Sequence, residues 1–533
     1  MKIFTTIKLL LFLVAFTNIY SQDFWEKTAI PDTTTIWSLA INSSGDIFAG
    51  TNLDGVFRST DNGASWTNLG ITNYDIYSIA IHSNGDILVT TIQEGGIFRS
   101  TDNGNNWDSL GLYLYDKSIA INSVGDIFVG ATALGIWRTT NDGINWEAIN
   151  NGMKSTRVNA LIIDSNEYIF AGTAVNSDSL GSGGVFRSTN NGENWVQINQ
   201  GLTELQIFSF AIDSNGVIFT GTSGGGVFRS TDNGNNWVQI KQGLSSEGHY
   251  VYSLAINSNG DIFAGTADGV FQSTDNGDNW VQINQGLTNL AVHSLAINSN
   301  DDIFAGTEGG IFRSNPSANI KIFIQGPFSS GSMSTALNTN NFIPLAQPYN
   351  TSPWNYAGTE AVDTIPAGVV DWILIELRTG TGSATIVGRR AAFLLSDGSV
   401  VDLDGVSTVK FPGVVTGNFY VVIRHRNHLA VMTANPITLS YSAVLYDFST
   451  AQTQAFGTNP MLDTGGSVWA LISGDVNASG DFSATDLLQV RIGVRDGESG
   501  YIGKDINLSG DMSSTDLLRV RQGIINGYST KVP

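Results

Sequence analysis

The chain has 533 residues, no cysteine and a formal net charge of -21, from 26 Lys and Arg against 47 Asp and Glu. This length exceeds what one hydrophobic core holds, so two or three domains are expected. The acidic balance disfavours nucleic acid and anionic lipid as partners, and the lack of cysteine excludes a disulfide framework and a lipid-anchored N-terminal cysteine.

The first 21 residues have the pattern of a secretory signal. Lys2 and Lys8 precede an apolar run over residues 9–16, and the small Ser21 marks a cleavage position. The run is too short to span a bilayer, and no other stretch of the sequence is long and apolar enough to do so. We expect a secreted or cell-surface monomer without a transmembrane segment, cleaved near Ser21.

The next part of the chain is repetitive. An eight-residue motif, Ser/Thr-Thr-Asp/Asn-Asn/Asp-Gly-x-x-Trp, occurs at residues 59–66, 100–107, 139–146, 188–195, 230–237 and 273–280. A strand motif that first occurs at residues 46–51 is found seven times, the last at 302–307. Units of about 40 residues with four short strands each predict a β-propeller, and seven strand motifs predict seven blades over residues 22–317.

The seventh unit stops at Ser314 without its final Trp-containing strand. Residues 24–28, which include Trp25, read like residues 194–198, which include Trp195. We expect this N-terminal strand to complete the seventh blade, because closing the ring removes exposed sheet edges.

The eight-residue motif resembles the Asp-box, the sialidase-type repeat shared by sialidases, sortilin-like receptors, a photosystem assembly factor and xyloglucan-cleaving propellers. The residues of the motif suit a tight turn: Asp61 can accept backbone N–H bonds, Gly63 can adopt a positive φ and Trp66 can cover the hairpin. Two copies carry Asn141 and Asn190 in place of the Asp. The motif therefore indicates architecture and is expected to be structural.

Function is expected on the face of the propeller where the loops vary. The turns between first and second strands hardly change, whereas the loops on the opposite face differ in nearly every unit, which is typical of a binding face. The residue that precedes the polar start of each first strand lies on that face. Around the ring these residues are Trp37, Tyr77, Lys117, Val158, Phe208, Tyr252 and His293. They are predicted to form an aromatic collar for a sugar or an extended peptide, with packing between blades as the alternative.

Acidic residues fall in the loops of the same face, namely Asp54, Glu94, Asp178, Asp268 and Glu308. A suitably spaced pair could hydrolyse a glycosidic bond, and solvated loop acids are the alternative. The arginines of the third strands recur in strict register, so they are expected to be structural; they are Arg58, Arg99, Arg138, Arg187, Arg229 and Arg313. No set of arginines at non-repeating places is evident, which disfavours a sialidase.

After a linker at residues 315–318 the periodicity ends. Strand-like runs at residues 320–324, 372–377, 391–395, 419–424 and 437–445 predict a second all-β domain over residues 318–472. This stretch resembles a β-sandwich module of large secreted proteins from polymer-degrading bacteria. His425 and His428 could share a metal only if a turn brought them together, and structural polar packing is the alternative.

Residues 473–533 contain two copies of a twelve-residue loop followed by a short helical run. Oxygen-bearing residues at positions 1, 3, 5, 7 and 12, with Gly at position 6, are typical of a Ca²⁺ loop. The pair resembles a type I dockerin, a calcium-binding module whose partner is a cohesin. Carried over residue by residue, the resemblance implies Asp475, Asn477, Ser479, Asp481 (carbonyl) and Asp486 as ligands in the first loop, and Asp505, Asn507, Ser509, Asp511 (carbonyl) and Asp516 in the second.

The sequence thus predicts a secreted, calcium-stabilised, mainly β protein whose propeller recognises an extracellular glycan or protein without catalysis. A glycoside hydrolase of the xyloglucan-cleaving type is one alternative, although those enzymes pair two propellers. A structural adhesin or spacer is the other. The tail either docks onto a cohesin-like module or only braces the neighbouring domain.

Overall fold

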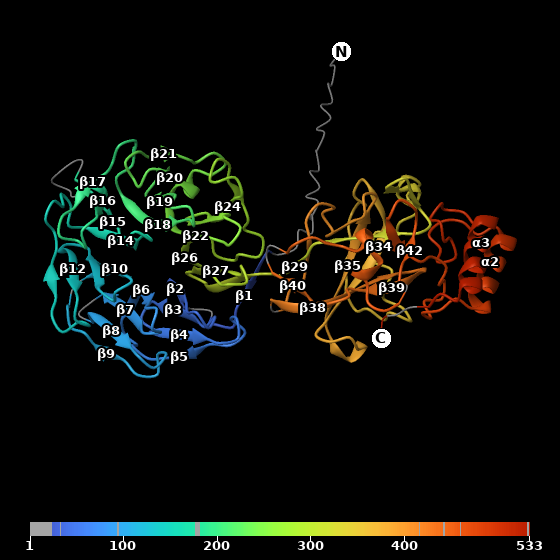
Figure 1. The fold of residues 1–533 in the computed structure, drawn as a ribbon, viewed down its shortest axis with the longest axis horizontal. Helices are drawn as coiled ribbons and strands as arrows, with labels where there is room; N and C mark the ends of the chain where they lie inside the picture. The colour runs from blue at the N-terminus through green and yellow to red at the C-terminus, as the bar shows by residue number, and fades with distance from the viewer. Residues whose placement is uncertain are drawn as a thin grey trace, which may run out of the picture.

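A computed structural model of the chain describes residues 24–31, 34–92, 95–113, 115–175, 182–414, 416–440, 443–458, 460–529 and 532. It has two lobes, one built from strands β1 to β28 and the other from the strands and helices that follow (Figure 1). None of the described helices is long and apolar enough to cross a membrane. The predicted signal at residues 1–21 lies outside the described residues.

The N-terminal lobe consists of seven antiparallel sheets of four strands each, which we number 1 to 7 by their innermost strands. The innermost strands are β2 (Ile36–Ile41), β6 (Asp75–Ile81), β10 (Asp116–Ile121), β14 (Val158–Ile163), β18 (Ile207–Ile212), β22 (Val251–Ile256) and β26 (Val292–Ile297). The second strands are β3 (Ile47–Thr51), β7 (Ile87–Ile92), β11 (Ile127–Ala131), β15 (Ile169–Thr173), β19 (Ile218–Thr222), β23 (Ile262–Thr266) and β27 (Ile303–Thr307).

Two further strands complete each sheet. The third strands are β4 (Val56–Ser59), β8 (Ile97–Ser100), β12 (Gly135–Thr139), β16 (Gly184–Ser188), β20 (Val227–Ser230), β24 (Gly269–Ser273) and β28 (Gly310–Ser314). The outermost strands of sheets 1 to 6 are β5 (Thr67–Asn68), β9 (Asp108–Ser109), β13 (Glu147–Ala148), β17 (Val196–Gln197), β21 (Val238–Gln239) and β25 (Val281–Gln282). A 3-10 turn, η1 (Glu247–His249), precedes β22.

The sheets are arranged as in a β-propeller. Each innermost strand packs against the innermost strand of the next sheet, and β26 packs against β2. Figure 1 shows these strands around a central space. Radial sheets of this kind leave only short, protected edges. The predicted mainly β fold is therefore confirmed.

The second strands explain how closely the sheets approach one another. All five residues of β3 are buried, as expected for a strand covered on both faces. A Cβ atom on Gly50 would lie 2.6 Å from Ile76 Cγ2 and 2.7 Å from Ile76 O in the next sheet. Glycine at this position therefore allows sheet 2 to pack directly against sheet 1.

The outermost strand of sheet 7 comes from the other end of the lobe. β1 (Trp25–Lys27) pairs antiparallel with β28, with Trp25 opposite Ser314 and Lys27 opposite Phe312. Trp25 Nε1 donates to Ile283 O at 2.6 Å, just as Trp195 Nε1 donates to Ile149 O, directly after the outermost strand of the preceding sheet. This is the pairing predicted from the likeness of residues 24–28 to 194–198.

The C-terminal lobe contains one large sheet and several small ones. In pairing order the large sheet comprises β39 (His428–Met432), β38 (Gly417–His425), β34 (Val369–Arg378), β35 (Ile386–Leu395), β36 (Ser399–Val401), β30 (Ile320–Lys321) and β41 (Tyr446–Asp447), with β40 (Ile437–Leu439) on β38. The small sheets comprise β31 (Phe323–Ile324), β43 (Trp469–Leu471) and β42 (Leu462–Asp463); β29 (Ser317–Ala318) and β37 (Val409–Lys410); and β32 (Phe328–Ser329) and β33 (Ser332–Met333). The helices are α1 (Ala336–Thr339), α2 (Ala484–Asp496) and α3 (Ser514–Asn526), with 3-10 turns η2 (Ser383–Thr385), η3 (Phe448–Thr450) and η4 (Gln452–Gln454).

The centre of this lobe is β34, in which every residue is buried. Its Trp372 packs on Phe393 of β35 with ring centroids 4.2 Å apart. The runs predicted at residues 372–377, 391–395 and 419–424 lie within β34, β35 and β38. The run at 320–324 is divided into β30 and β31, which belong to different sheets, because Ile322 between them donates its N–H to Gly398 O. The run predicted over 437–445 is a strand only to Leu439.

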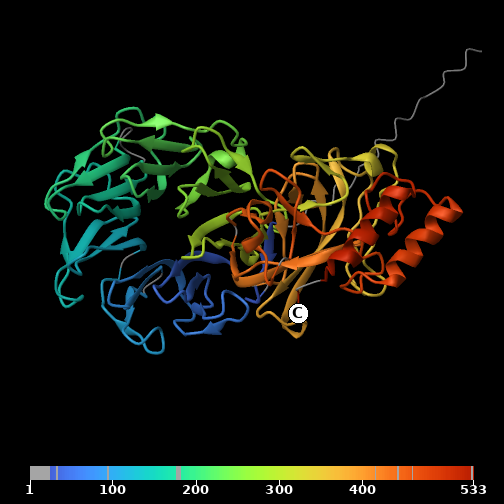
Figure 2. The ribbon, with the colours of Figure 1, turned by 45° about the vertical axis from the view of Figure 1, so that its right-hand side comes forward.

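Helices α2 and α3 pack against each other at the end of the C-terminal lobe farthest from the N-terminal lobe (Figures 1 and 2). The segment that contains them also enters the core of the lobe. Leu508 is 1% exposed and belongs to the same cluster of buried side chains as Trp372 and Phe393.

Candidate functional site

The two faces of the N-terminal lobe differ in how their turns are built. On one face the turn between β2 and β3 is closed by Asn42 N donating to Asp46 O at 3.0 Å, and the Asp-box turns between third and outermost strands lie at the same end. On the other face the innermost strands begin and the variable loops meet. Every innermost strand carries an irregularity at this second face.

This irregularity is a β-bulge. In β2, Ile36 pairs with Thr51 and Ser38 pairs with Gly50, so Trp37 has no opposite residue. The same register shift occurs in all seven sheets. The bulged residues, which we call the collar, are Trp37, Tyr77, Lys117, Asn159, Phe208, Tyr252 and His293.

One predicted collar residue is wrong. The sequence comparison placed Val158 in the collar, but Val158 pairs with Thr173, Ala160 pairs with Gly172, and Asn159 is the bulged residue. Val158 is fully buried. The comparison aligned Asn159 with Ser38 because both are polar, whereas Ala160 occupies the position of Ser38. The collar residue Asn159 was missed for this reason.

Five collar residues bring their rings together. The centroids of Trp37 and Tyr77 lie 5.1 Å apart with an interplanar angle of 11°, and those of Trp37 and His293 lie 4.6 Å apart. Tyr252 lies 5.5 Å from His293 and 5.7 Å from Phe208. These five rings, which we call the ring arc, run without a gap across sheets 5, 6, 7, 1 and 2. They pack on one another and remain half-buried.

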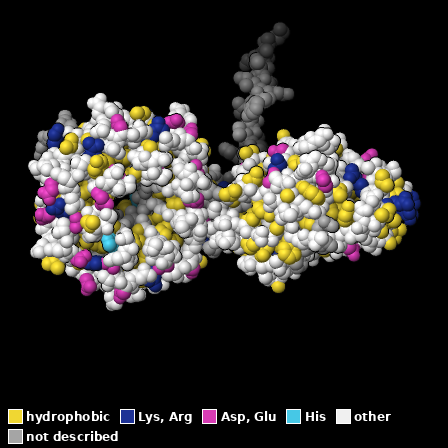
Figure 3. All heavy atoms as spheres, in the orientation of Figure 1, with side chains coloured by type: hydrophobic (Ala, Val, Ile, Leu, Met, Phe, Trp, Pro, Cys, Tyr) yellow, Lys and Arg dark blue, Asp and Glu magenta, His cyan; other side chains and the backbone are white. Residues whose placement is uncertain are grey.

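The ring arc carries no positive charge near neutral pH. Burial raises the pKa of Tyr77, with a contribution from the Asp75 carboxylate, and burial also raises the pKa of Tyr252. Burial lowers the pKa of His293, although Glu308 opposes this shift. Both phenols therefore stay protonated and the imidazole stays neutral, so the arc presents neutral ring faces. Figure 3 shows the hollow at the centre of this lobe.

The predicted loop acids have different surroundings. Asp54 is exposed and accepts a hydrogen bond from Thr34 Oγ1 at 3.3 Å. Asp268 accepts from Ser245 Oγ at 2.6 Å, and Glu308 lies 3.7 Å from His293 Nε2. Glu94 and Asp178 lie outside the described residues, as does the side chain of Lys117.

The Asp-box turns on the opposite face are satisfied locally. Asp61 Oδ1 accepts from Ser65 N at 2.8 Å, and Ser59 Oγ accepts from Gly63 N at 2.8 Å. Hydrogen bonds from Asn106 lower the pKa of Asp102, and equivalent bonds do so for Asp232 and Asp275. Asn141 and Asn190 keep the same bond to backbone without the charge. These contacts support a structural role for the motif.

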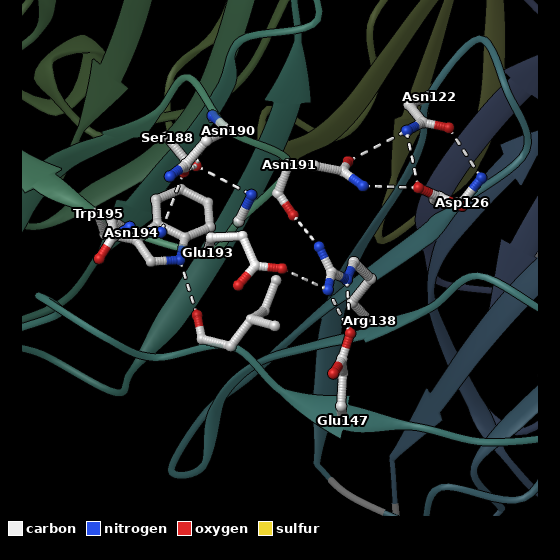
Figure 4. Close-up of polar contacts among 12 residues, drawn as sticks. Asn122, Asp126, Arg138, Glu147, Ser188, Asn190, Asn191, Glu193, Asn194 and Trp195 are labelled. Carbon is white, nitrogen blue, oxygen red and sulfur yellow. Dashed lines mark hydrogen bonds and ion pairs between the residues drawn. The ribbon is translucent and has the colours of Figure 1, made fainter.

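The periodic arginines join neighbouring sheets. Arg138 donates from Nη1 to Asn191 O in the Asp-box of the next sheet, and Asn191 Nδ2 donates back to Asp126 Oδ2 at 2.7 Å (Figure 4). The same bond to a carbonyl of the next box is made by Arg58, Arg187, Arg229 and Arg313. Arg313 closes the series by reaching Asn62 of sheet 1. The reciprocal asparagine bonds were not predicted from the sequence.

The two calcium loops predicted near the C-terminus have nearly the same hydrogen bonds. Asp475 accepts from Ser479 N and Gly480 N, both at 2.9 Å, and Asp505 accepts from Ser509 N at 3.2 Å and Gly510 N at 2.7 Å. The carboxylates at position 12 lie in the first turn of the helices, where Asp486 and Asp516 form capping boxes with Ser483 and Ser513.

The donor atoms of these loops fit a hard cation. Burial raises the pKa of Asp475 to about 6, and repulsion from Asp486 and Asp481 adds to the shift. Burial likewise raises the pKa of Asp505 to about 6, with repulsion from Asp516. Within the described ranges no group of three or more His, Asp or Glu side chains is placed to hold a metal ion. Each loop would therefore depend on a mixed set of oxygens that also includes Asn477 or Asn507, Ser479 or Ser509, and the carbonyl of Asp481 or Asp511.

The two histidines singled out in the sequence do meet. Residues 426 and 427 form a tight turn between β38 and β39, so His425 Nδ1 and His428 Nδ1 lie 2.9 Å apart. His425 Nε2 lies 3.1 Å from Asp371 Oδ2, and Asn427 Nδ2 donates to Asp505 O at 2.8 Å. These partners support polar packing for the pair, and they connect it to the second of the loops predicted to bind calcium.

Comparison with known proteins adds a family to this picture. The structure of YCF48 bound to D1 peptide is 18% identical, with a TM-score of 0.45, over 55% of this chain and 97% of that chain. The extracellular domain of a putative one-component system from B. thetaiotaomicron is 16% identical, with a TM-score of 0.47, over 77% of this chain and 59% of that chain. Virginiamycin B lyase from Staphylococcus aureus is 14% identical, with a TM-score of 0.46, over 54% of this chain and 97% of that chain.

A search of curated proteins found no match. The profile of the family described as photosynthesis system II assembly factor YCF48 matches residues 17–314. This match covers more than half of the chain. It contains all seven sheets of the N-terminal lobe and ends at Ser314. The chain therefore belongs to the YCF48 family of photosynthesis system II assembly factors.

Proposed function

We propose that this chain is a secreted, non-catalytic recognition protein whose N-terminal lobe is a closed seven-bladed Asp-box propeller that binds a protein partner through the collar. The family takes its name from an assembly factor, and assembly requires contact with other polypeptides. The leader pattern of residues 1–21 supports secretion.

The observation that carries this proposal is the ring arc. Rings that only packed between sheets would be covered, whereas these five are half-buried and lie at the end of the strands where the loops vary. Partly exposed aromatic side chains on a rigid scaffold supply large contact area at a small entropic cost. The opposite face has its polar groups engaged in turns and in bonds between sheets.

Other functions lack an equivalent observation. A glycoside hydrolase needs two carboxylates across a sugar-sized gap. Asp54 is exposed and held by Thr34, and Glu94 lies outside the described residues. A glycan remains the second candidate ligand, because ring faces also stack on sugars.

A binding screen tests the proposal. The chain from residue 22 to 533 would be applied to peptide and polysaccharide arrays, with reducing-sugar release followed in parallel. We expect peptide binding without sugar release, weakened about tenfold in Trp37→Ala by the loss of about 1.4 kcal/mol of ring contact, and largely kept in Trp37→Phe. Binding only to glycan would favour the second candidate, and sugar release lost in Asp54→Asn would identify an enzyme.

For residues 318–533 we propose a β-sandwich followed by a dockerin-like module that binds one Ca²⁺ in each loop and has a cohesin-type partner. The support is the equivalent bonding of the two loops and the raised pKa values of Asp475 and Asp505, since a cation would relieve the repulsion between neighbouring carboxylates. Calcium titration of the chelator-treated chain, followed by calorimetry, should show two sites that are lost in the double variant Asp475→Ala and Asp505→Ala. The exposed Asp496→Ala serves as the control, and equal binding by the double variant would exclude these loops.

A further inference from the structure

We infer that the collar recognises a positively charged segment of its polypeptide partner, an inference that rests on the proposed binding function of the collar. The first observation is the charge of the loops that border the ring arc. On the collar face of sheets 7, 1 and 2 the described residues of these loops are 28–31, 34–35, 51–55, 70–75, 92, 95–96, 284–291 and 307–310. They contain Asp54, Asp75 and Glu308, and no Lys or Arg.

The described acids lie close to the rings. Asp75 begins β6 two residues before Tyr77, and its Oδ1 is buried with no hydrogen-bond partner among the described residues. Glu308, which is 55% exposed, lies beside His293. Trp37 stacks on Tyr77 and contacts His293, so these two carboxylates flank it in neighbouring sheets.

Neutral rings and carboxylates attract the same ligand group. An ammonium or guanidinium group is drawn to the face of Trp or Tyr, and nearby carboxylates strengthen the attraction. The neutral state of His293 removes the one charge within the arc that would oppose it. Lys and Arg side chains of a polypeptide carry this chemistry on long apolar stems, which suit the ring faces.

Sheets 3 and 4 of the collar have the opposite character. Sheets 3 and 4 place Lys117 and Asn159 at the bulge, and the loop before β14 carries Lys154 and Arg157. Lys154 Nζ donates to Gln197 Oε1 at 2.8 Å, and Arg157 Nη1 to Val175 O at 3.3 Å. A basic segment is therefore directed to the acidic side of the collar, over sheets 7, 1 and 2.

The experiment uses two fluorescein-labelled octapeptides with alternating residues, one of Lys and Gly and one of Gln and Gly, and the chain from residue 22 to 533. Anisotropy is measured at 20 and 150 mM NaCl. We expect the Lys peptide to bind at least about tenfold more tightly than the Gln peptide, and more weakly at the higher salt. Trp37→Ala and Asp75→Asn should each weaken binding about tenfold, whereas Trp37→Phe should retain most of it.

The matched control is Asp278→Asn, which removes one carboxylate from the Asp-box face, where Asp278 is paired only with Arg229 at 3.1 Å. If this variant weakened binding as much as Asp75→Asn, the attraction would be non-specific and the inference would be wrong. Equal, Trp37-dependent binding of both peptides would overturn the inference while leaving the collar as a binding site. If neither peptide bound and the arrays were also blank, the proposed function itself would fail. Unchanged thermal midpoints of the variants would show that loss of binding is not loss of fold.

Discussion

At the residue scale, the histidine pair of the C-terminal lobe is a buried polar arrangement with several partners. His425 shares a hydrogen bond with Asp371, so its Nδ1 is left to accept from His428 Nδ1, which also lies 2.7 Å from Asn427 Oδ1. Burial lowers the pKa of His425, and that of His428 well below its ordinary value. Burial alone would raise the pKa of Asp371, but the charge of Arg426 and the hydrogen bonds from His425 and Arg426 together hold this pKa below its ordinary value and keep the carboxylate ionised.

The two histidines are therefore expected to destabilise this lobe below about pH 6.5, and the raised pKa values of Asp475 and Asp505 oppose part of that effect. The unfolded chain binds protons at both histidines and the folded chain does not, so the free energy of unfolding falls by up to about 2 kcal/mol per histidine at pH 5. Hydrogen exchange of β38 and β39, corrected for intrinsic rates, measures this difference between pH 7 and pH 5. His428→Asn should remove roughly half of the histidine contribution, and His82→Asn in the other lobe should not change the difference. A pH dependence unaffected by His428→Asn would contradict the conclusion that the folded chain holds His428 unprotonated.

At the element scale, the third strands hold the ring of sheets together. Five of their arginines donate to a carbonyl in the Asp-box of the next sheet, and Arg99 reaches Asp142 there at 3.2 Å. β24 is the exception, since it carries Gln272. The next sheet is the seventh, whose outermost strand is β1 and which contains no Asp-box. An arginine in β24 would lack the acceptor that the others use.

Two reciprocal substitutions test this explanation. Arg58→Gln is expected to lower the free energy of unfolding of the N-terminal lobe by about 1 kcal/mol, because the bond to Asn103 O is lost. Gln272→Arg should leave it almost unchanged. Thermal unfolding followed by circular dichroism compares the two variants with the parent chain. A gain in Gln272→Arg as large as the loss in Arg58→Gln would mean that arginine stabilises these strands without the Asp-box carbonyl.

At the scale of the whole molecule, the two loops predicted to bind calcium are built into the C-terminal lobe. Leu508 of the second loop lies in the main core, Asn427 donates to Asp505 O, and the Arg426 guanidinium lies 4.2 Å from the Tyr501 ring centroid. Thr515, next to the start of α3, lines a groove together with Gln325 of residues 318–472, which we call the β region. These contacts favour a module that braces its neighbour and presents only part of its surface to a partner.

This view predicts that a core residue of the tail stabilises the β region. Leu508→Ala should cost about 3 kcal/mol and make residues 318–472 more sensitive to protease, because it leaves a cavity in a shared core. Leu518→Ala in α3 removes a leucine that is 64% exposed and should have little effect. Limited proteolysis of both variants, with calcium and with chelator, provides the measurement. If Leu508→Ala leaves the β region as resistant as the parent chain, the tail is an independent module.

The sequence by itself determined the repeat, the four short strands of each unit, the completing role of residues 24–28 and the collar position in six of the seven sheets. These features follow from local chemistry, because tight turns require Asp, Asn and Gly at fixed places and these residues recur in each unit. Only the tertiary structure decided that Asn159 and not Val158 is bulged, that the rings form one arc, that the arginines join neighbouring sheets, and that Leu508 lies in the core of another segment. Strand register and contacts between distant segments depend on how whole sheets pack, and no single repeat contains that information.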